Sequence, residues 1–290
     1  MVSERDGRAT RRPAVLVHDS WWAVRSMTIA LLCLVSIDSF AQKEHANIIG
    51  VGHTDILDTY LSQEAATGID LRYTWEKANR KPERHWSSYV SQEAFLTKAG
   101  TRGNDNSFLG AMYNLRFGWH YNLDSPLALG SYGAMGESLG ATHASPLNVR
   151  LGLLADFSLG GLYNTRNGNN PAQARVSLSV DPSVMLAWRF SVNGKPFALR
   201  YEAAVPLVGM AFSPNYGQSY YEIFSRGNYD HNIVFTSPFS GPQLHQMLAF
   251  DFRLWGTTFT VGYLGDIRQM DANNLKFHQY THSVVFGWRY

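Results

Sequence analysis

Apolar and polar residues alternate over unusually long segments of this chain. Between residues 147 and 159 every second position is apolar, and Asn148 and Arg150 stand among the positions between them. The same alternation runs through residues 176–190 and 197–207. A period of two is the pattern of a β-strand whose two faces meet different surroundings. Such strands exceed the roughly five or six residues usual in soluble proteins, whereas a membrane-crossing strand needs about 9–11 residues plus an overhang. The pattern therefore favours a transmembrane β-barrel over a soluble β-sandwich.

The composition fits this class of protein. Charged residues make up 17% of the chain, whereas about 25% is usual in soluble domains. The longest apolar run falls well short of the ~18 residues that a membrane-spanning helix needs. The formal net charge is only +2, so we expect no nucleic-acid partner.

The beginning of the chain has the features of a secretory signal. Residues 28–37 form an apolar run after Arg25, and Ser39-Phe40-Ala41 follows as a cleavage site of the small-x-small type. The preceding Arg-rich residues do not belong to such a signal, so we predict Met27 as the true start of translation.

Removal of the signal leaves a single domain. We predict that residues 1–41 are cleaved on export and that residues 42–290 form the barrel. The single cysteine, Cys33, lies within the signal, so we expect no disulfide or thiol chemistry in the exported protein.

The predicted fold is all-β, an antiparallel barrel of ten strands. The predicted ranges are 46–53, 68–77, 86–98, 107–121, 146–162, 173–190, 196–212, 242–254, 257–270 and 275–290. Outer-membrane barrels keep both termini and short turns in the periplasm and long loops outside. Successive connections between strands alternate between the two sides of the membrane. This alternation places the Asn193-Gly194 turn in the periplasm and the connections 54–67, 163–172 and 213–241 outside. The long segment 122–145 fits poorly, and a hidden hairpin there would give twelve strands.

The last strand alternates up to an aromatic C-terminus. Every second residue from Tyr280 to Tyr290 is aromatic, histidine or valine. Bacterial outer-membrane barrels end in this way, and the barrel assembly machinery recognises that strand. We therefore expect two partners, outer-membrane lipid around the barrel and the assembly machinery at Tyr290, and a location in the outer membrane of a Gram-negative bacterium.

Several long motifs are specific enough to suggest a family. They are GVGHTDILDTYL at 50–61, GWHYN at 118–122, LYNTRNGNNPAQAR at 162–175 and the segment 212–232. The chain resembles, over essentially all of residues 45–290, an uncharacterised family of exported Bacteroidetes proteins that carries a domain-of-unknown-function label. The resemblance implies the outer membrane of a Bacteroidetes cell and no established activity.

The predicted external loops are dense in residues that can bind a polar ligand. The candidates for ligand binding are His53, Asp55, Arg166, Tyr220, Asp230 and His231. Carboxylates, imidazoles, a guanidinium and an aromatic ring suit the recognition of a surface glycan or lipid headgroup. The alternative is structural: Asn, Gly and Asp form turns, and the longest loop fills the lumen. The motifs favour a binding or structural role over catalysis.

A lipid hydrolase of the phospholipase or lipid A deacylase type is the enzymatic alternative. Such enzymes carry a His-x-Ser pair with a serine nucleophile and a histidine base. Two pairs occur here, His85 with Ser87 and His143 with Ser145, and Ser225 with Asp230 and His231 is a third set. About one pair is expected by chance, so no catalytic residue is assigned.

Charged residues on the polar faces of the strands suggest a third possibility, a narrow anion-preferring channel. The predicted inward set is Arg116, Arg150, Arg175, Arg189, Arg200, Arg253 and Arg289 with Asp156, Asp181, Glu202 and Asp251. Because a ten-stranded lumen is narrow, we expect these residues to brace the wall rather than line a pore. His53, Asp55 and Asp58 lack the spacing of a metal loop, and we predict no metal and no cofactor.

Overall fold

The computed structural model describes residues 42–80, 84–103, 106–123, 147–168 and 170–290. The predicted signal peptide with its start at Met27 and Cys33, and the pair His143 and Ser145, lie outside the described residues. In the described part of the chain, no helix is long and apolar enough to cross a membrane.

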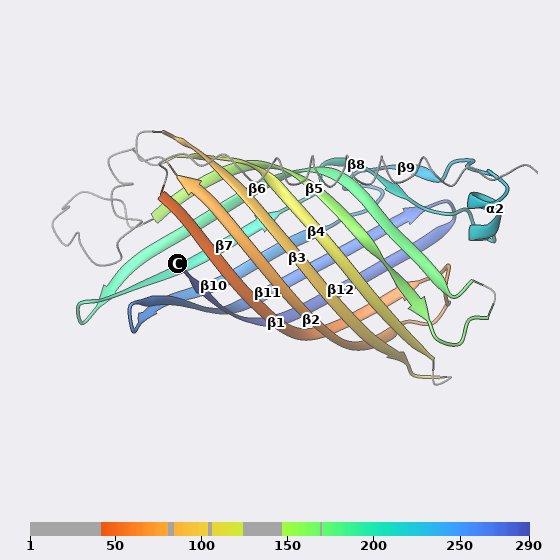
Figure 1. The fold of residues 1–290 in the computed structure, drawn as a ribbon, viewed down its shortest axis with the longest axis horizontal. Helices are drawn as coiled ribbons and strands as arrows, with labels where there is room; N and C mark the ends of the chain where they lie inside the picture. Colours follow the sequence, from red (N-terminus) through yellow and green to blue (C-terminus); the bar gives the residue numbers. More distant parts are fainter. Residues whose placement is uncertain (1–41, 81–83, 104–105, 124–146, 169) are drawn as a thin grey trace, which may run out of the picture. The chain divides into compact units, whose positions relative to one another are not determined.

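Long antiparallel strands make up almost all of the described structure (Figure 1). The strands are β1 (Gln42–Asp58), β2 (Ala66–Arg80), β3 (Trp86–Thr101), β4 (Ser107–Asn122), β5 (Leu147–Asn164), β6 (Ala172–Val192), β7 (Lys195–Ala204), β8 (Val208–Phe212), β9 (Ile233–Thr236), β10 (Leu244–Leu254), β11 (Thr257–Ala272) and β12 (Leu275–Arg289), and a short helix α2 (Tyr220–Phe224) precedes β9. The predicted strands match these bounds closely except for β1, which was predicted as 46–53 and extends beyond that range at both ends. The alternation did not reveal β9.

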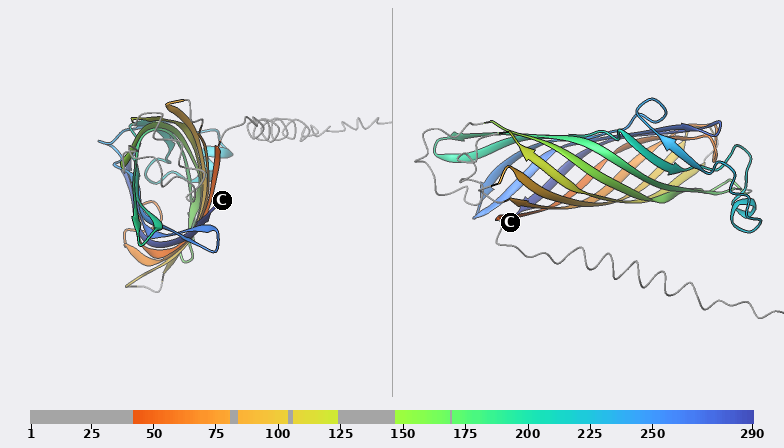
Figure 2. Two further views of the ribbon diagram at one scale, coloured as in Figure 1. Left: turned by 90° about the vertical axis from the view of Figure 1, so that its left-hand side faces the viewer. Right: turned by 90° about the horizontal axis from the view of Figure 1, so that it is seen from above.

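The strands close into a ring, which the end-on view shows (Figure 2, left). Each of β1 to β6 pairs with the next strand, β7 pairs with β10, each of β10 and β11 pairs with the next strand, and β12 pairs back onto β1. The predicted strand 196–212 corresponds to β7 and β8 together, which are separated at Pro206 and both pair with β6. The barrel therefore has ten strands around its circumference, as predicted. The twelve-strand alternative is wrong, because β4 pairs directly with β5 and leaves no place for a hairpin between them.

The register of the ladders sets the tilt of the strands. Paired residues followed around the barrel from His53 through β2 to β5 lead to Ala172 on β6. Followed the other way, through β12, β11, β10 and β7, they lead to Val184, twelve residues further along β6. This offset between the two paths is the shear of the barrel, and it requires the strands to tilt. Ten strands with this tilt enclose a lumen that side chains can fill.

The two faces of the wall differ as the alternation predicts. Leu153 and Val284 on the outer face are 55% and 69% exposed, whereas Asn148, Arg150 and Asp156 on the inner face are buried. Aromatic side chains gather on the outer face near the barrel end that holds the C-terminus. They are Trp86, Trp119, Tyr121, Trp188 and Tyr290. An apolar outer band, an aromatic girdle and a polar lumen are typical of a membrane-spanning barrel.

The opposite end of the lumen holds an apolar cluster, which the alternation did not predict, beside the buried Asp58–Arg175 ion pair. A cluster of buried side chains crosses the barrel there, just beneath the loops, and we call it the apolar plug. Its members are Ile56, Leu61, Ala66, Ala99, Phe108, Leu162, Ala211, Met270 and Phe277. Phe108 is completely buried, so the plug lies between the polar lumen and the described loops.

Candidate functional site

The longest connection among the described residues, 213–232, is a structured surface that we call the α2 loop. The buried Gln218 side chain holds it together: its carbonyl oxygen accepts hydrogen bonds from Asn215 N (3.0 Å) and Asn232 Nδ2 (2.7 Å). Its amide nitrogen donates to Asn228 O at 3.0 Å. Asn273, in the β11–β12 turn, donates to the backbone of this loop. One amide thus joins both halves of the loop.

Helix α2 begins with a capping box. The Ser219 hydroxyl accepts a hydrogen bond from the backbone N–H of Glu222 (3.3 Å), and the Glu222 carboxylate accepts one from the backbone N–H of Ser219 (2.8 Å). This reciprocal pair satisfies backbone donors that the start of a helix leaves free. It explains how a helix of five residues persists in a surface loop.

We predict that the α2 loop loosens in acid. The Ser219 N–H and hydroxyl donate to Glu222 and lower the pKa of its carboxyl group. Because the folded-state pKa is the lower one, this stabilisation is complete above the unfolded-state pKa and is lost as the pH falls through the folded-state pKa. Amide exchange in residues 213–232, corrected for its intrinsic pH dependence, should report greater opening at about pH 3 than at about pH 7. Glu222→Gln should remove this difference, and an unchanged acid response in that variant would contradict the assignment.

Two tyrosines attach the α2 loop to the barrel. Tyr60, in the β1–β2 connection, donates its hydroxyl hydrogen to Gln218 O at 2.9 Å. Tyr220 accepts from Ala174 N at 2.6 Å and donates to Gln173 Oε1 at 3.1 Å, both on β6. The two rings meet edge to face at 6.0 Å. Burial raises the pKa of both phenols, so both stay neutral donors at physiological pH.

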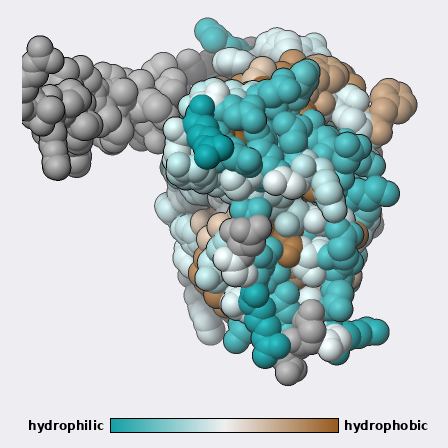
Figure 3. Space-filling model, turned by 90° about the vertical axis from the view of Figure 1, so that its right-hand side faces the viewer, coloured by the Kyte–Doolittle hydropathy of each residue, from teal (hydrophilic) through white to brown (hydrophobic). Residues whose placement is uncertain are grey.

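The α2 loop exposes several aromatic rings to solvent. Tyr216 is 70% exposed, and Tyr221 and Tyr229 are each 63% exposed. The Arg226 guanidinium lies 5.5 Å from the centre of the Tyr221 ring. Figure 3 views this end of the barrel, where most of the visible surface is hydrophilic. Exposed rings on a restrained, polar loop form a surface that can stack on a flat ligand.

The six predicted site residues do not converge on one place. His53 and Asp55 were expected on a loop, but β1 extends to Asp58, and both lie on the outer face of this strand. Their side chains are 3.4 Å apart, and His53 also contacts Thr67 on β2. The loop placement is therefore wrong, because the strand continues beyond the point where the alternation becomes irregular.

The other four predicted residues are at the loop end of the barrel. Arg166 is exposed in the β5–β6 connection, where its backbone N–H donates to Asn164. Asp230 and His231 form an exposed pair at 2.5 Å on the α2 loop. Tyr220 is turned toward the barrel wall and positions the loop.

Beneath the apolar plug, ion pairs fill the lumen. Arg116 contacts Asp156 at 2.6 Å, and Arg200 bonds both Glu202 and Asp251. These predicted inward residues brace neighbouring strands. Arg253 is the exception, because it is exposed near the end of β10.

The densest charged cluster was missed by the sequence analysis. Arg72 contacts Asp70 at 2.7 Å, Asp266 at 3.4 Å and Glu93 at 3.5 Å, and Arg268 contacts Asp266 at 3.0 Å. A signal was present: residues 70–76 read DLRYTWE, in which charged or hydroxyl side chains alternate with apolar ones. The metal-like grouping of Glu93, Asp266 and His245 belongs to this cluster. Since Arg72 and Arg268 already contact both Glu93 and Asp266, we assign no ion to this grouping.

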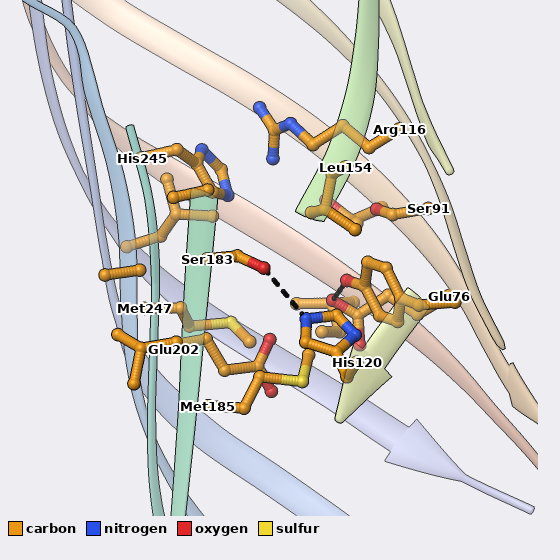
Figure 4. A pocket seen from close by; sticks show the side chains of 17 residues that line it. Glu76, Ser91, Arg116, His120, Leu154, Ser183, Met185, Glu202, His245 and Met247 are labelled. Atoms are coloured by element: carbon orange, nitrogen blue, oxygen red, sulfur yellow. Dashed lines mark hydrogen bonds between the residues drawn. The ribbon is translucent and has the colours of Figure 1, made fainter. Parts of the chain in front are cut away.

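A small cavity of about 30 Å³ lies in the lumen toward the C-terminal end of the barrel (Figure 4). Ser183 and His120 point toward each other across it, with 3.0 Å between the hydroxyl oxygen and Nε2. The sequence did not reveal this pair, because the two residues lie on different strands. His120 is 1% exposed, so a lipid substrate has no access to it.

The predicted His-x-Ser and triad sets do not form catalytic arrangements in the described residues. Ser87 donates to the backbone oxygen of His120 rather than to His85, whose ring stacks on Tyr121. Among the described contacts, His231 pairs with Asp230, and no bond joins it to Ser225.

A closed ten-stranded barrel with an apolar outer face and a braced lumen has the architecture of the outer-membrane barrels. The chain belongs to the DUF3316 family, described as proteins of unknown function, whose family model matches residues 33–289. This confirms the predicted family of unknown function. A search of curated proteins returned no significant match.

Several solved outer-membrane barrels are similar to this chain. The transport unit of the autotransporter AIDA-I from Escherichia coli is 6% identical with a TM-score of 0.48, covering 92% of this chain and 96% of its own. The translocator domain of NalP from Neisseria meningitidis is 10% identical with a TM-score of 0.36, covering 96% and 100%. The COG4313 outer membrane channel from Pseudomonas putida F1 is 8% identical with a TM-score of 0.34, covering 88% and 99%.

Proposed function

We propose that this protein is an outer-membrane barrel of a Gram-negative bacterium, specifically of a Bacteroidetes cell, and that the α2 loop binds a glycan at the cell surface. The apolar outer band supports the location, and so does the placement of the long described loops at one end of the barrel and the short turns at the end that holds the C-terminus. The observation that carries the binding role is the set of exposed tyrosine rings on a loop fixed by Gln218 and by the Ser219 cap.

Carbohydrate recognition suits this surface chemically. Sugar rings present an apolar face that stacks on aromatic rings and hydroxyl groups that bond to charged side chains. Tyr216, Tyr221 and Tyr229 supply the rings, and Arg226 with the Asp230–His231 pair supplies charged partners. Since the loop is already ordered, binding loses little conformational entropy.

The predicted site residues take different parts in this proposal. Asp230 and His231 contact the glycan, and Tyr220 positions the loop. Arg166 extends the surface from the β5–β6 connection. His53 and Asp55, on the outer face of β1, instead meet lipid headgroups at the membrane boundary.

We predict that the triple variant Tyr216→Ala, Tyr221→Ala and Tyr229→Ala loses glycan binding while the barrel still assembles. Loss of stacking at three rings should weaken binding by at least about tenfold. The measurement is binding of the detergent-solubilised protein to an array of bacterial lipopolysaccharide and capsular oligosaccharides. The matched control is Trp255→Ala, which removes an 89% exposed ring from the β10–β11 turn at the other end of the barrel. Native protein that binds nothing on the array, or a triple variant that binds as well as the native protein, would overturn the proposal.

The other two functions have less support from the geometry. A channel needs an open path, whereas ion pairs and the apolar plug fill the described lumen. A lipid hydrolase needs its nucleophile at the lipid surface, whereas the Ser183–His120 pair lies inside the barrel. We therefore propose a binding role without turnover.

A further inference from the structure

The barrel wall is interrupted between β9 and β11. The ladder between β10 and β11 runs from the Leu254–Thr257 pair to the Leu244–Ile267 pair and stops there. Strand β11 continues to Ala272, while β9 is paired only with β8 among the described strands. Strand β9 lies antiparallel beside β8, and Figure 1 shows both at the upper side of the barrel. The segment 237–243 therefore occupies the place where a continuous strand would close the wall.

The sequence accounts for this interruption. Pro238 and Pro242 lie in the segment, and proline has no N–H to donate to a neighbouring strand. Ser237 and Ser240 instead bond to each other in a local turn. The backbone bond from Asp271 N to Ser240 O, 2.8 Å, links this turn to β11. A short turn held by few bonds is easier to displace than a ladder.

The interruption lies between an apolar outer rim and a cavity of mixed lining. Behind it, inside the lumen, is a cavity of about 50 Å³ whose walls include Thr97, Met270 and Phe277, and also Arg175 and Arg268. Both guanidiniums are paired with carboxylates, Arg175 with Asp58 and Arg268 with Asp266. In front of it, Phe235 is 70% exposed and Phe239 is 99% exposed. The apolar plug blocks the way from this cavity to the loops, and the charged cluster around Arg72 lies on its other side. In the described part of the chain, the turn at 237–243 is therefore where an apolar ligand would reach the cavity, through the wall.

We propose that this interruption is a lateral port through which the alkyl chain of an outer-leaflet membrane lipid enters the lumen. The proposal rests on the membrane location proposed above, and it adds a second ligand site that is independent of the α2 loop. The cavity has room for only a few atoms, so the turn at 237–243 moves aside when the chain inserts. An alkyl chain fits because the rim is apolar and faces the membrane, and because Phe95, Leu162, Met270 and Phe277 give the cavity an apolar wall beside its paired arginines.

The exported chain has no cysteine, so single cysteines can test access from the membrane. Thr97→Cys places a thiol in the cavity, and Ser91→Cys is the matched control. Both positions lie on β3 with the same inward orientation, and their exposed fractions are 5% and 3%. Ser91 lines the other cavity, nearer the C-terminal end of the barrel. The probe is N-dodecylmaleimide dissolved in phosphatidylcholine vesicles that contain the assembled barrel, and labelling is followed by mass spectrometry.

We expect the Thr97→Cys variant to be labelled at least about tenfold faster than the Ser91→Cys variant, because only the side chain at position 97 lies behind the port. A charged water-soluble methanethiosulfonate should label neither variant efficiently. Equal rates for the two variants, or faster labelling of the Thr97→Cys variant by the charged reagent, would overturn the port. Adding Ala211→Phe, which fills the cavity, should slow labelling at position 97. Val51→Cys, on the outer face, reports membrane insertion: if the lipid probe does not reach it, the membrane location fails rather than the port alone.

Discussion

Replacing Arg200 by leucine should lower the free energy of unfolding by about 3–5 kcal/mol, the usual cost of leaving buried ion-pair partners without their cation. Arg200 is 7% exposed and bonds carboxylates on two strands, Glu202 on β7 and Asp251 on β10. Thr260 on β11 also donates to Asp251, at 2.6 Å. The variant leaves two buried carboxylates without their cation, and the lumen cannot hydrate them fully. Urea unfolding of the barrel in vesicles, followed by tryptophan fluorescence, measures the change.

Arg253→Leu is the control for this prediction. Arg253 lies two residues beyond Asp251 on β10 but is exposed, so its loss should change the free energy of unfolding by no more than about 0.5 kcal/mol. Replacing Arg200, Glu202 and Asp251 together by apolar residues should recover much of the lost stability, because neither Glu202 nor Asp251 is then left as a buried carboxylate without its cation. Equal effects of Arg200→Leu and Arg253→Leu would show that the lumen ion pairs do not brace the wall.

The alternation predicted the fold because a membrane barrel imposes different surroundings on the two faces of each strand. Arg150 and Arg200 could be assigned to the lumen because they stand at the polar positions of the alternation, and both are buried. The prediction was poorest for β1, where Gly50 and Gly52 interrupt the pattern and hid the fact that the strand continues to Asp58. His53 was consequently placed on a loop.

The order of the α2 loop could not be read from the sequence. Its density of Asn, Gln and Tyr indicated a surface rich in polar groups, but the contact of Gln218 with Asn228 and Asn232 depends on the loop folding back on itself. The Ser219 and Glu222 spacing was a usable signal, since a serine followed three residues later by glutamate is a capping box. Long-range partners such as Tyr60 carry no such local signature.

Phe286→Arg should strongly reduce assembly of the barrel. Phe286 is on the outer face of β12, and its paired neighbours Ile49 and Val261 are also exposed there. These three side chains form part of the apolar band, so a charge among them faces lipid. Arginine in the middle of such a band costs about 2–4 kcal/mol. We expect a large fall in the heat-modifiable, folded form of the protein in the outer-membrane fraction.

A matched control tests whether lipid or water surrounds the side chain of Phe286. Tyr216 on the α2 loop is more exposed than Phe286, 70% against 47%. If exposure alone mattered, Tyr216→Arg would be no better tolerated than Phe286→Arg. We expect Tyr216→Arg to assemble normally, because the loop meets water, which solvates the guanidinium. Deleting Tyr290 tests a different step, recognition of the last strand by the assembly machinery, and should lower the assembled amount; barrels refolded in detergent should lose little beyond the contacts that Tyr290 makes with His45 at the end of the strand. Normal assembly of Phe286→Arg would mean that this face of β12 does not meet lipid.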